Sequence, residues 1–162
     1  MRSFVVQPGV DWTKNLALKM PARQSTLYSS AVPASRAVDG NRNTNFHKLS
    51  CTHTQEKTGS WWEVDLGAVY EIWDVVLTNR DEAEERLKGF VIEVVRGGNT
   101  RQCASVAGQL EKGETRRITC TVGAIGNIVK VRLTGKAPQV LTLCEVEVFG
   151  VRGKSNLIDN IK

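Results

Sequence analysis

The stretch Ser60-Trp-Trp-Glu-Val-Asp-Leu-Gly67 decides the fold class of this chain. Within it, Trp62, Val64 and Leu66 alternate with other residues before a glycine, which is the pattern of a half-buried β-strand that ends in a turn. Because alternate side chains of a strand point to opposite faces, Trp62 is expected in the core and Trp61 over an edge. Neither tryptophan is assigned to a binding site, although aromatic faces can stack on sugars.

The same period of two returns along the chain, in runs rich in β-branched residues. The runs cover 72–77, 90–94, 118–122, 129–133 and 143–148. Glycines separate them, and no long helical pattern interrupts them. The sequence therefore predicts an all-β fold, an antiparallel β-sandwich. The polar, turn-rich residues before Trp61, including Asp39-Gly-Asn-Arg-Asn-Thr-Asn45, are expected to form loops at one end of the sandwich.

Length and charge narrow the class of protein. The 162 residues suit one domain, and the net charge is +5 with a pI of about 9.2. Basic residues are spread among acidic ones rather than gathered in a run, so nucleic acid is not an expected partner. No apolar run is long enough to cross a bilayer, so no membrane insertion is expected. The first residues lack the features of a signal peptide, so the chain is expected to be a mature fragment with an added Met1 or part of a longer protein.

The four cysteines, Cys51, Cys103, Cys120 and Cys144, have no C-x-x-C spacing, which favours disulfides in an oxidising compartment over a zinc site. Three pairings are possible. Cys103 and Cys120 lie in neighbouring β-like runs that adjacent strands would bring together, which leaves Cys51 to pair with Cys144. This second bridge would close a loop of about 90 residues and stabilise the fold by about 4 to 5 kcal/mol.

One imidazole and two guanidiniums, those of His53, Arg80 and Arg86, are the best candidates for a binding site. They suit a cluster of neutral hydroxyls, because guanidinium donates several hydrogen bonds and accepts none. The alternative is a pair of exposed arginines that form weak ion pairs with Glu82, Glu84 or Glu85, beside a surface histidine.

Two carboxylates, those of Asp39 and Glu145, would meet if Cys51 pairs with Cys144. With the Ser50 hydroxyl and the carbonyls of the Asn-rich turn, they would offer Ca²⁺ the oxygen ligands that it prefers. The alternative is an Asx-turn at Asp39 and an ordinary strand-edge glutamate.

Seven motifs in order resemble the F-type lectins, a family of fucose-binding proteins, over about residues 12–150. They are Asn15-Leu-Ala-Leu18, Ala37-Val-Asp-Gly-Asn41, Ser50-Cys-Thr-His53, Trp61-Trp-Glu-Val-Asp-Leu-Gly67, Leu77-Thr-Asn-Arg80, Glu85-Arg-Leu87 and Cys144-Glu-Val-Glu-Val-Phe-Gly150. Repeats of bivalve sperm bindins are also similar. The resemblance implies an eight-stranded jelly-roll β-sandwich of the galactose-binding-domain type, with residues 1–11 as an N-terminal extension and 151–162 as a C-terminal tail.

The resemblance also implies a role for individual residues. His53, Arg80 and Arg86 would bond to the ring oxygen and to the 4- and 3-hydroxyls of L-fucose, with Asp81 beside them. Phe46 would pack on the C6 methyl, and Leu27 and Tyr28 would line the rim. The implied ligands of a structural Ca²⁺ are the Arg36 carbonyl, Asp39, the Asn41 carbonyl, Ser50, the Cys144 carbonyl and Glu145. The implied disulfides are Cys51–Cys144 and Cys103–Cys120.

The sequence departs from the family between the two arginines. Many members carry two adjacent cysteines there, whereas this chain has the shorter Asp81-Glu-Ala-Glu-Glu85. We expect this acidic loop to disfavour sialylated or sulfated glycans.

The expectation is thus a secreted, non-enzymatic, calcium-stabilised lectin for terminal L-fucose on glycoproteins or microbial glycans, with a role in innate defence or in gamete and cell recognition. A homo-oligomer or a tandem repeat in a longer parent would add avidity. The alternative is a discoidin-like C-type module that binds phospholipid or protein, which would need exposed apolar residues on its loops. An enzyme is not expected, because no pair of catalytic carboxylates with an activating partner is evident.

Overall fold

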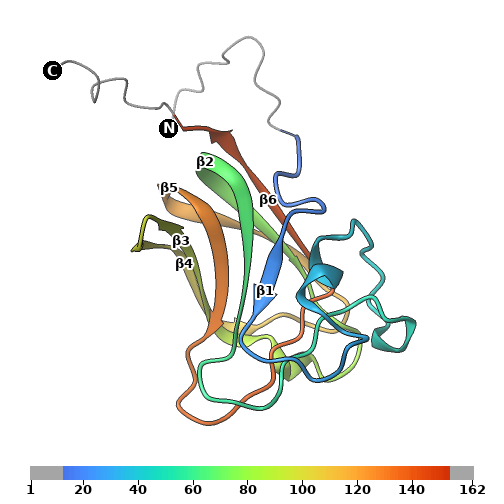
Figure 1. Ribbon diagram of the computed structural model, residues 1–162. Helices are drawn as coiled ribbons and strands as arrows, with labels where there is room; N and C mark the ends of the chain where they lie inside the picture. The colour runs from blue at the N-terminus through green and yellow to red at the C-terminus, as the bar shows by residue number, and fades with distance from the viewer. Residues whose placement is uncertain (1–12, 154–162) are drawn as a thin grey trace, which may run out of the picture.

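The computed structural model describes residues 13–153 of the chain (Figure 1). The strands of this part are β1 (Ala22–Gln24), β2 (Trp61–Thr78), β3 (Lys88–Arg96), β4 (Asn99–Gln109), β5 (Thr115–Leu133) and β6 (Glu145–Arg152). Three short 3-10 helices, η1 (Ala34–Val38), η2 (Phe46–Lys48) and η3 (Glu84–Arg86), lie in the loops. None of the described helices has the length and apolar character that crossing a membrane requires.

Two long strands, β2 and β5, each take part in both layers of a β-sandwich. The first half of β2 pairs with β1 and with the second half of β5, which in turn pairs with β3, and β3 pairs with β4. The second half of β2 lies between β6 and the first half of β5. All of these pairings are antiparallel, and register shifts between Asp65 and Asp74 mark where β2 bends from one layer to the other. With the two halves of β2 and β5 counted separately, this is the jelly-roll β-sandwich that the sequence predicted.

The core fills the space between the layers with the alternate residues of each strand. Trp62 is fully buried as predicted, and its indole N–H donates to the Ala34 carbonyl at 2.9 Å. Trp61 is only partly buried, and the Lys130 ammonium lies 4.4 Å from the centroid of its ring. The backbones approach closely at Gly126, where an added Cβ would lie 2.4 Å from the carbonyl oxygen of Val95.

Both disulfides of the structure, Cys51–Cys144 and Cys103–Cys120, are those expected from the sequence. One premise was wrong, because β3 lies between β4 and β5 in the sheet order, so Cys103 and Cys120 do not lie on hydrogen-bonded neighbours. The bend of β5 places the first half of this strand, with Cys120, in the layer opposite β4. The Cys103–Cys120 disulfide therefore connects the two layers. Strand β6 continues to Arg152; the expected extension 1–11 and residues 154–162 of the expected tail lie outside the described residues.

The bend of β2 lies at one end of the sandwich, and the long loops gather at the other (Figure 1). At this end, which we call the loop end, lie the segments before Trp61, after Thr78 and before Glu145. These segments contain nearly all the residues singled out by the sequence.

Candidate functional site

His53 lies on a segment that hydrogen bonds hold against the chain before β6. The backbone N–H groups of Thr52 and Thr54 donate to the carbonyls of Leu143 and Leu141 at 2.8 and 3.1 Å. The two threonine hydroxyls in turn accept from the N–H groups of the same leucines, at 3.1 and 2.9 Å. Alternate residues of the segment thus bond inward, and His53 projects between them into the loop end.

The imidazole of His53 is buried, with 6 % of the residue exposed. Its Nε2 lies 3.0 Å from Nη1 of Arg86, and its Nδ1 lies 2.7 Å from the Thr54 carbonyl oxygen. Because guanidinium can only donate, Nε2 must accept and Nδ1 must carry the proton. Burial lowers the pKa of His53, and the charges of Arg86 and Arg80 lower it further, although the hydrogen bond to Thr54 opposes them. The ring is therefore a neutral acceptor in this site.

Arg80 follows the end of β2, and only 5 % of the residue is exposed. Its guanidinium carbon lies 4.3 Å from the centroid of the Phe46 ring. Its Nε and Nη1 are buried and have no hydrogen-bond partner in the protein. Nη2 meets the Glu82 carboxylate at 3.6 Å. The arginine thus keeps donors free in a place where free donors are costly.

The alternative of two exposed, ion-paired arginines is wrong for Arg80, because the side chain is buried, although Glu82 is its acidic neighbour. Within residues 13–153, Arg86 forms no ion pair, and its guanidinium donates to His53 instead. The structure therefore brings His53, Arg80 and Arg86 together around Phe46, whose ring centroid lies 5.4 Å from that of His53.

Asn79 is a positioning residue that the sequence reasoning missed. It is fully buried, and its side-chain N–H₂ donates to the carbonyls of Glu84 and Leu110 at 3.2 and 2.9 Å. Its Oδ1 accepts from the backbone N–H of Arg80 at 3.0 Å. This one amide thus holds the loop that contains both arginines. The sequence offered one indication of this role, because Asn79 follows an apolar run and directly precedes the candidate residue Arg80.

The rim of the site comes from three loops. The Tyr28 ring lies 4.2 Å from that of His53, and 62 % of the residue is exposed. Leu27 is also exposed. The backbone N–H of Asp81 donates to Thr44 at 3.0 Å, and its exposed side chain acts on Arg80 only through its charge.

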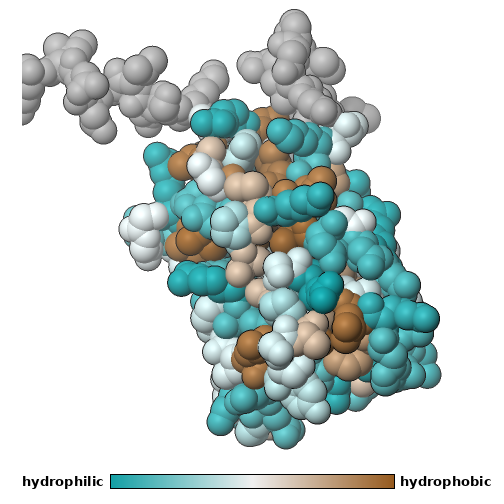
Figure 2. Space-filling model, turned by 45° about the vertical axis from the view of Figure 1, so that its right-hand side comes forward, coloured by the Kyte–Doolittle hydropathy of each residue, from teal (hydrophilic) through white to brown (hydrophobic). Residues whose placement is uncertain are grey.

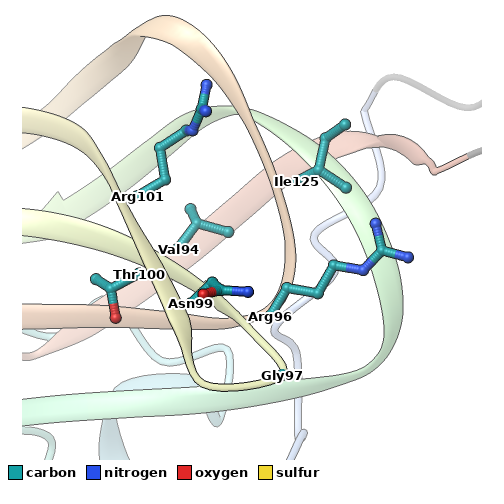
Figure 3. Close-up of a pocket in the computed structure, with 7 residues that line it drawn as sticks. All are labelled: Val94, Arg96, Gly97, Asn99, Thr100, Arg101 and Ile125. Atoms are coloured by element: carbon teal, nitrogen blue, oxygen red, sulfur yellow. The ribbon is translucent and has the colours of Figure 1, made fainter.

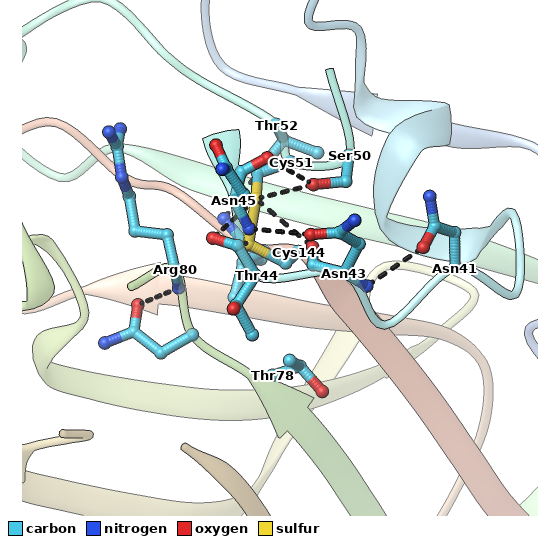
Figure 4. The surroundings of a disulfide bond; sticks show 12 residues. Asn41, Asn43, Thr44, Asn45, Ser50, Cys51, Thr52, Thr78, Arg80 and Cys144 are labelled. Atoms are coloured by element: carbon cyan, nitrogen blue, oxygen red, sulfur yellow. Dashed lines mark hydrogen bonds between the residues drawn. A yellow bond between two sulfur atoms is a disulfide. The ribbon is translucent and has the colours of Figure 1, made fainter. Parts of the chain in front are cut away.

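A ladder of side-chain hydrogen bonds shapes the loop before Phe46. Asp39, Asn41, Asn43 and Asn45 each accept, through Oδ1, from the backbone N–H two residues further on, all at 2.9 Å. Figure 4 shows part of this ladder beside the Cys51–Cys144 disulfide and Arg80. The recurrence of Asp or Asn at every second position was visible in the sequence, but its role in fixing the approach to Phe46 was not.

The predicted calcium ligands flank this ladder. Glu145 is 1 % exposed, and neither of its carboxylate oxygens has a partner at good hydrogen-bond geometry, although the backbone N–H groups of Gly40 and Val146 lie near enough to lower its pKa. Burial raises the pKa of Glu145 to about 8, and the nearby charge of Asp39 adds to the effect. Ser50 is buried, and its hydroxyl donates to the Asn45 carbonyl at 2.9 Å, which leaves the oxygen free as an acceptor. The Asx-turn at Asp39 is present as the alternative proposed, but Glu145 is not an ordinary edge residue.

The carboxylates alone do not form a cage. Among the described residues no group of three or more His, Cys, Asp or Glu side chains gathers around one point. A cation here would therefore depend on backbone carbonyls, which the predicted set takes from Arg36, Asn41 and Cys144.

A separate hollow of about 520 Å³ lies at the turn between β3 and β4 (Figure 3). It is lined by Val94, Arg96, Gly97, Asn99, Thr100, Arg101 and Ile125. These residues lie at the other end of β3 from Arg86, and none of them belongs to the predicted sugar or calcium sites.

Known proteins resemble this chain in sequence and in structure. A family model described as a NedA-like, galactose-binding domain matches residues 36–131. Fucolectin-4 of Anguilla japonica is 44 % identical over 147 residues, which cover 83 % of this chain and 79 % of the relative. This chain belongs to the F-type lectin (fucolectin) family.

Solved structures agree with the assignment to the F-type lectins. The fucolectin from the serum of the striped bass, Morone saxatilis, superposes with a TM-score of 0.79 at 35 % identity, covering 86 % of this chain and 48 % of that one. The lectin domain of lectinolysin, in complex with Lewis B antigen, gives 0.72 at 30 % identity, covering 87 % and 98 %. As an F-type lectin, the chain is a carbohydrate-binding module and not an enzyme.

Proposed function

We propose that this F-type lectin is a secreted, calcium-stabilised protein that binds terminal L-fucose on glycans, in innate defence or in gamete and cell recognition. One observation carries the sugar proposal: Arg80 keeps Nε and Nη1 buried and unpartnered, beside the neutral acceptor Nε2 of His53. The oxygen of a sugar hydroxyl can accept from this guanidinium, and the hydroxyl can donate to Nε2 of His53 only where it displaces Arg86 from that acceptor. Two neighbouring hydroxyls of a pyranose would accept from the two donors of Arg80 that have no partner in the protein.

The names of similar proteins support fucose as the sugar. Relatives at about 40 % identity are fucolectins, and the lectinolysin domain was solved with Lewis B antigen. In this chain the apolar partner for the C6 methyl of fucose would be Phe46, whose ring contacts both Arg80 and His53. One wall and a few directed bonds make a shallow site of modest affinity, so we expect avidity from several sites to matter.

The residues present suit a calcium ion. A buried carboxylate without a hydrogen bond of good geometry is unfavourable, and a divalent cation bound by Glu145 and Asp39 would remove that cost. The Ser50 oxygen and the carbonyls of Arg36, Asn41 and Cys144 would complete the oxygen ligands. A bound ion would fix the start of the ladder that leads to Phe46, so its role would be structural.

The test is calorimetric titration of L-fucose, with D-galactose as the control sugar, into the wild type and Arg80→Met in calcium buffer. Methionine keeps the side chain over Phe46 but removes the donors, and we expect fucose affinity to fall at least about tenfold. Arg117→Met is the matched control, because Arg117 also lies over an aromatic ring, Phe149 at 5.0 Å, and also pairs with an acid, Asp74 at 3.1 Å.

The result that would overturn the proposal is wild-type protein that does not bind fucose at tens of millimolar. Equal affinities for the two arginine variants would also contradict it. If Arg80→Met does not fold, as judged by circular dichroism, Arg86→Met tests the same site from a half-buried position.

The alternative, a module that binds phospholipid or protein, is favoured by one observation. Leu27 and Leu49 are 46 % and 44 % exposed on loops next to the site. Sedimentation with phosphatidylserine vesicles tests it: vesicle binding that is lost in Leu27→Ser together with Leu49→Ser, without fucose binding, would replace the lectin proposal.

A further inference from the structure

The loop between the two arginines is strongly acidic. Asp81, Glu82, Glu84 and Glu85 occupy four of its five positions. These acidic residues lie next to Arg80 and Arg86. The effect of each carboxylate on the site depends on whether it lies close enough to contact an arginine.

Glu82 makes direct contact with the site. One oxygen, Oε2, lies 3.6 Å from Nη2 of Arg80 and 3.4 Å from Nε2 of His47. The side chains of Glu82 and His47 are 61 % and 71 % exposed, whereas that of Arg80 is 5 % exposed. The carboxylate therefore lies at the mouth of the site, above a buried guanidinium.

The loop also changes the electrostatic surroundings of Arg80. Burial lowers the pKa of Arg80, and the like charge of Arg86 adds to this, while Glu82, Asp81 and Glu85 act in the opposite sense. Glu84 is not among the groups that act on Arg80. The acidic residues thus differ in their reach, and Glu82 has the largest effect of the three.

Two neighbouring arginines without acids would favour a carboxylate or sulfate ligand, because paired charge-assisted bonds to anions are among the strongest that guanidinium makes. A carboxylate fixed at the mouth repels such a ligand and leaves the inner donors to neutral hydroxyls. The acidic loop thereby accounts for a sugar site that contains two arginines and still suits a neutral sugar.

We propose that Glu82 is a specificity-determining residue, which makes this site select neutral fucosides over fucosides that carry a sulfate or carboxylate. The inference rests on the proposed function, since it concerns the same site. Glu82 acts through charge at the rim, and the bonds to the sugar itself come from His53, Arg80 and Arg86.

The experiment compares the dissociation constant of L-fucose 2-sulfate with that of L-fucose. The sulfate is placed on the 2-hydroxyl because this hydroxyl is not among the groups assigned to the three site residues. The wild type is expected to bind the sulfated sugar more weakly. In Glu82→Gln the dissociation constant of the sulfated sugar divided by that of fucose should fall about 1.5- to fivefold, the range for an exposed charge pair, and in Glu82→Lys it should fall further. High salt should reduce the wild-type ratio, because exposed charges are screened.

Glu84→Gln is the matched control, since it removes the same charge from the same loop without a contact to Arg80. Its ratio should remain that of the wild type. The inference is overturned if Glu82→Gln and Glu84→Gln give equal ratios while fucose still binds. If the wild type binds neither sugar, it is the proposed function that has failed, so the two failures are distinguishable.

Discussion

At the scale of single residues, His53 decides which hydrogen bonds the site offers. Its Nδ1 proton is committed to Thr54, and Nε2 faces Arg86 as an acceptor. A protonated ring would lose the acceptor and would repel the two arginines. The site is therefore sensitive to acid through one group whose position in the structure is known.

We predict that fucose affinity is constant from pH 8.5 to about 6.5 and falls only in more acidic solution. The pKa of folded His53 lies below its ordinary value of 6.5, so the unfolded chain binds more protons just below that pH. The same group therefore makes the fold less stable as pH falls below 6.5.

Titration of the ring by NMR, beside calorimetry at each pH, checks this. The chain has only two histidines, so His47→Gln leaves His53 as the one histidine signal. A loss of affinity that begins above pH 7 would contradict the prediction.

The sequence was sufficient to predict that the side chains of His53, Arg80 and Arg86 lie together, but not which residues support them. The spacing of His53, Arg80 and Arg86 matched the motif of a known family, and such a motif can be matched position by position in a sequence. The role of Asn79 depends on Leu110, a residue 31 positions away, and that proximity comes from packing of the whole fold. The contact of Glu82 with Arg80 likewise depends on the path of the loop and not on composition.

At the scale of secondary structure, the two bent strands connect the layers and bring the loops to one end. The alternating runs at 62–66 and 72–77 were predicted as separate strands, and the structure joins them in β2. Alternation reports which side chains are buried but not whether the backbone stays extended through a bend. The short β1 carried no apolar pattern and was missed, as was most of β4, which is exposed along much of its length.

We predict that Gly126→Ala lowers the free energy of unfolding by more than about 2 kcal/mol, since the new Cβ would lie 2.4 Å from the Val95 carbonyl oxygen and must displace backbone. Gly108→Ala is the control, because nothing lies within 4 Å of its added Cβ, and it should change stability by less than about 0.5 kcal/mol. Urea unfolding measures both. Equal effects would mean that the approach of β5 to β3 is not tight.

At the scale of the whole molecule, the Glu145 carboxylate links stability to pH and, if the proposed ion binds, to calcium. With a folded pKa of about 8, against 4.5 ordinarily, calcium-free protein binds more protons folded than unfolded between these values. Its stability should therefore fall as pH rises through this window, by up to about 1.4 kcal/mol per pH unit. Calcium competes with the proton, so it should raise the melting temperature more at pH 8 than at pH 5.5.

Thermal unfolding in EDTA and in calcium at both pH values makes the comparison, with Glu145→Gln as the variant that removes the titrating group. The prediction fails if calcium stabilises the wild type equally at both pH values. It also fails if Glu145→Gln keeps the full effect of calcium.

The bend of β2 has a practical consequence for how the molecule can be held. The last described residue, Gly153, donates to the Val69 carbonyl in that bend, at the opposite end of the sandwich from the gathered loops (Figure 1). A copy immobilised on a sensor chip through Gly153 would direct the site around Phe46 into the flowing sample.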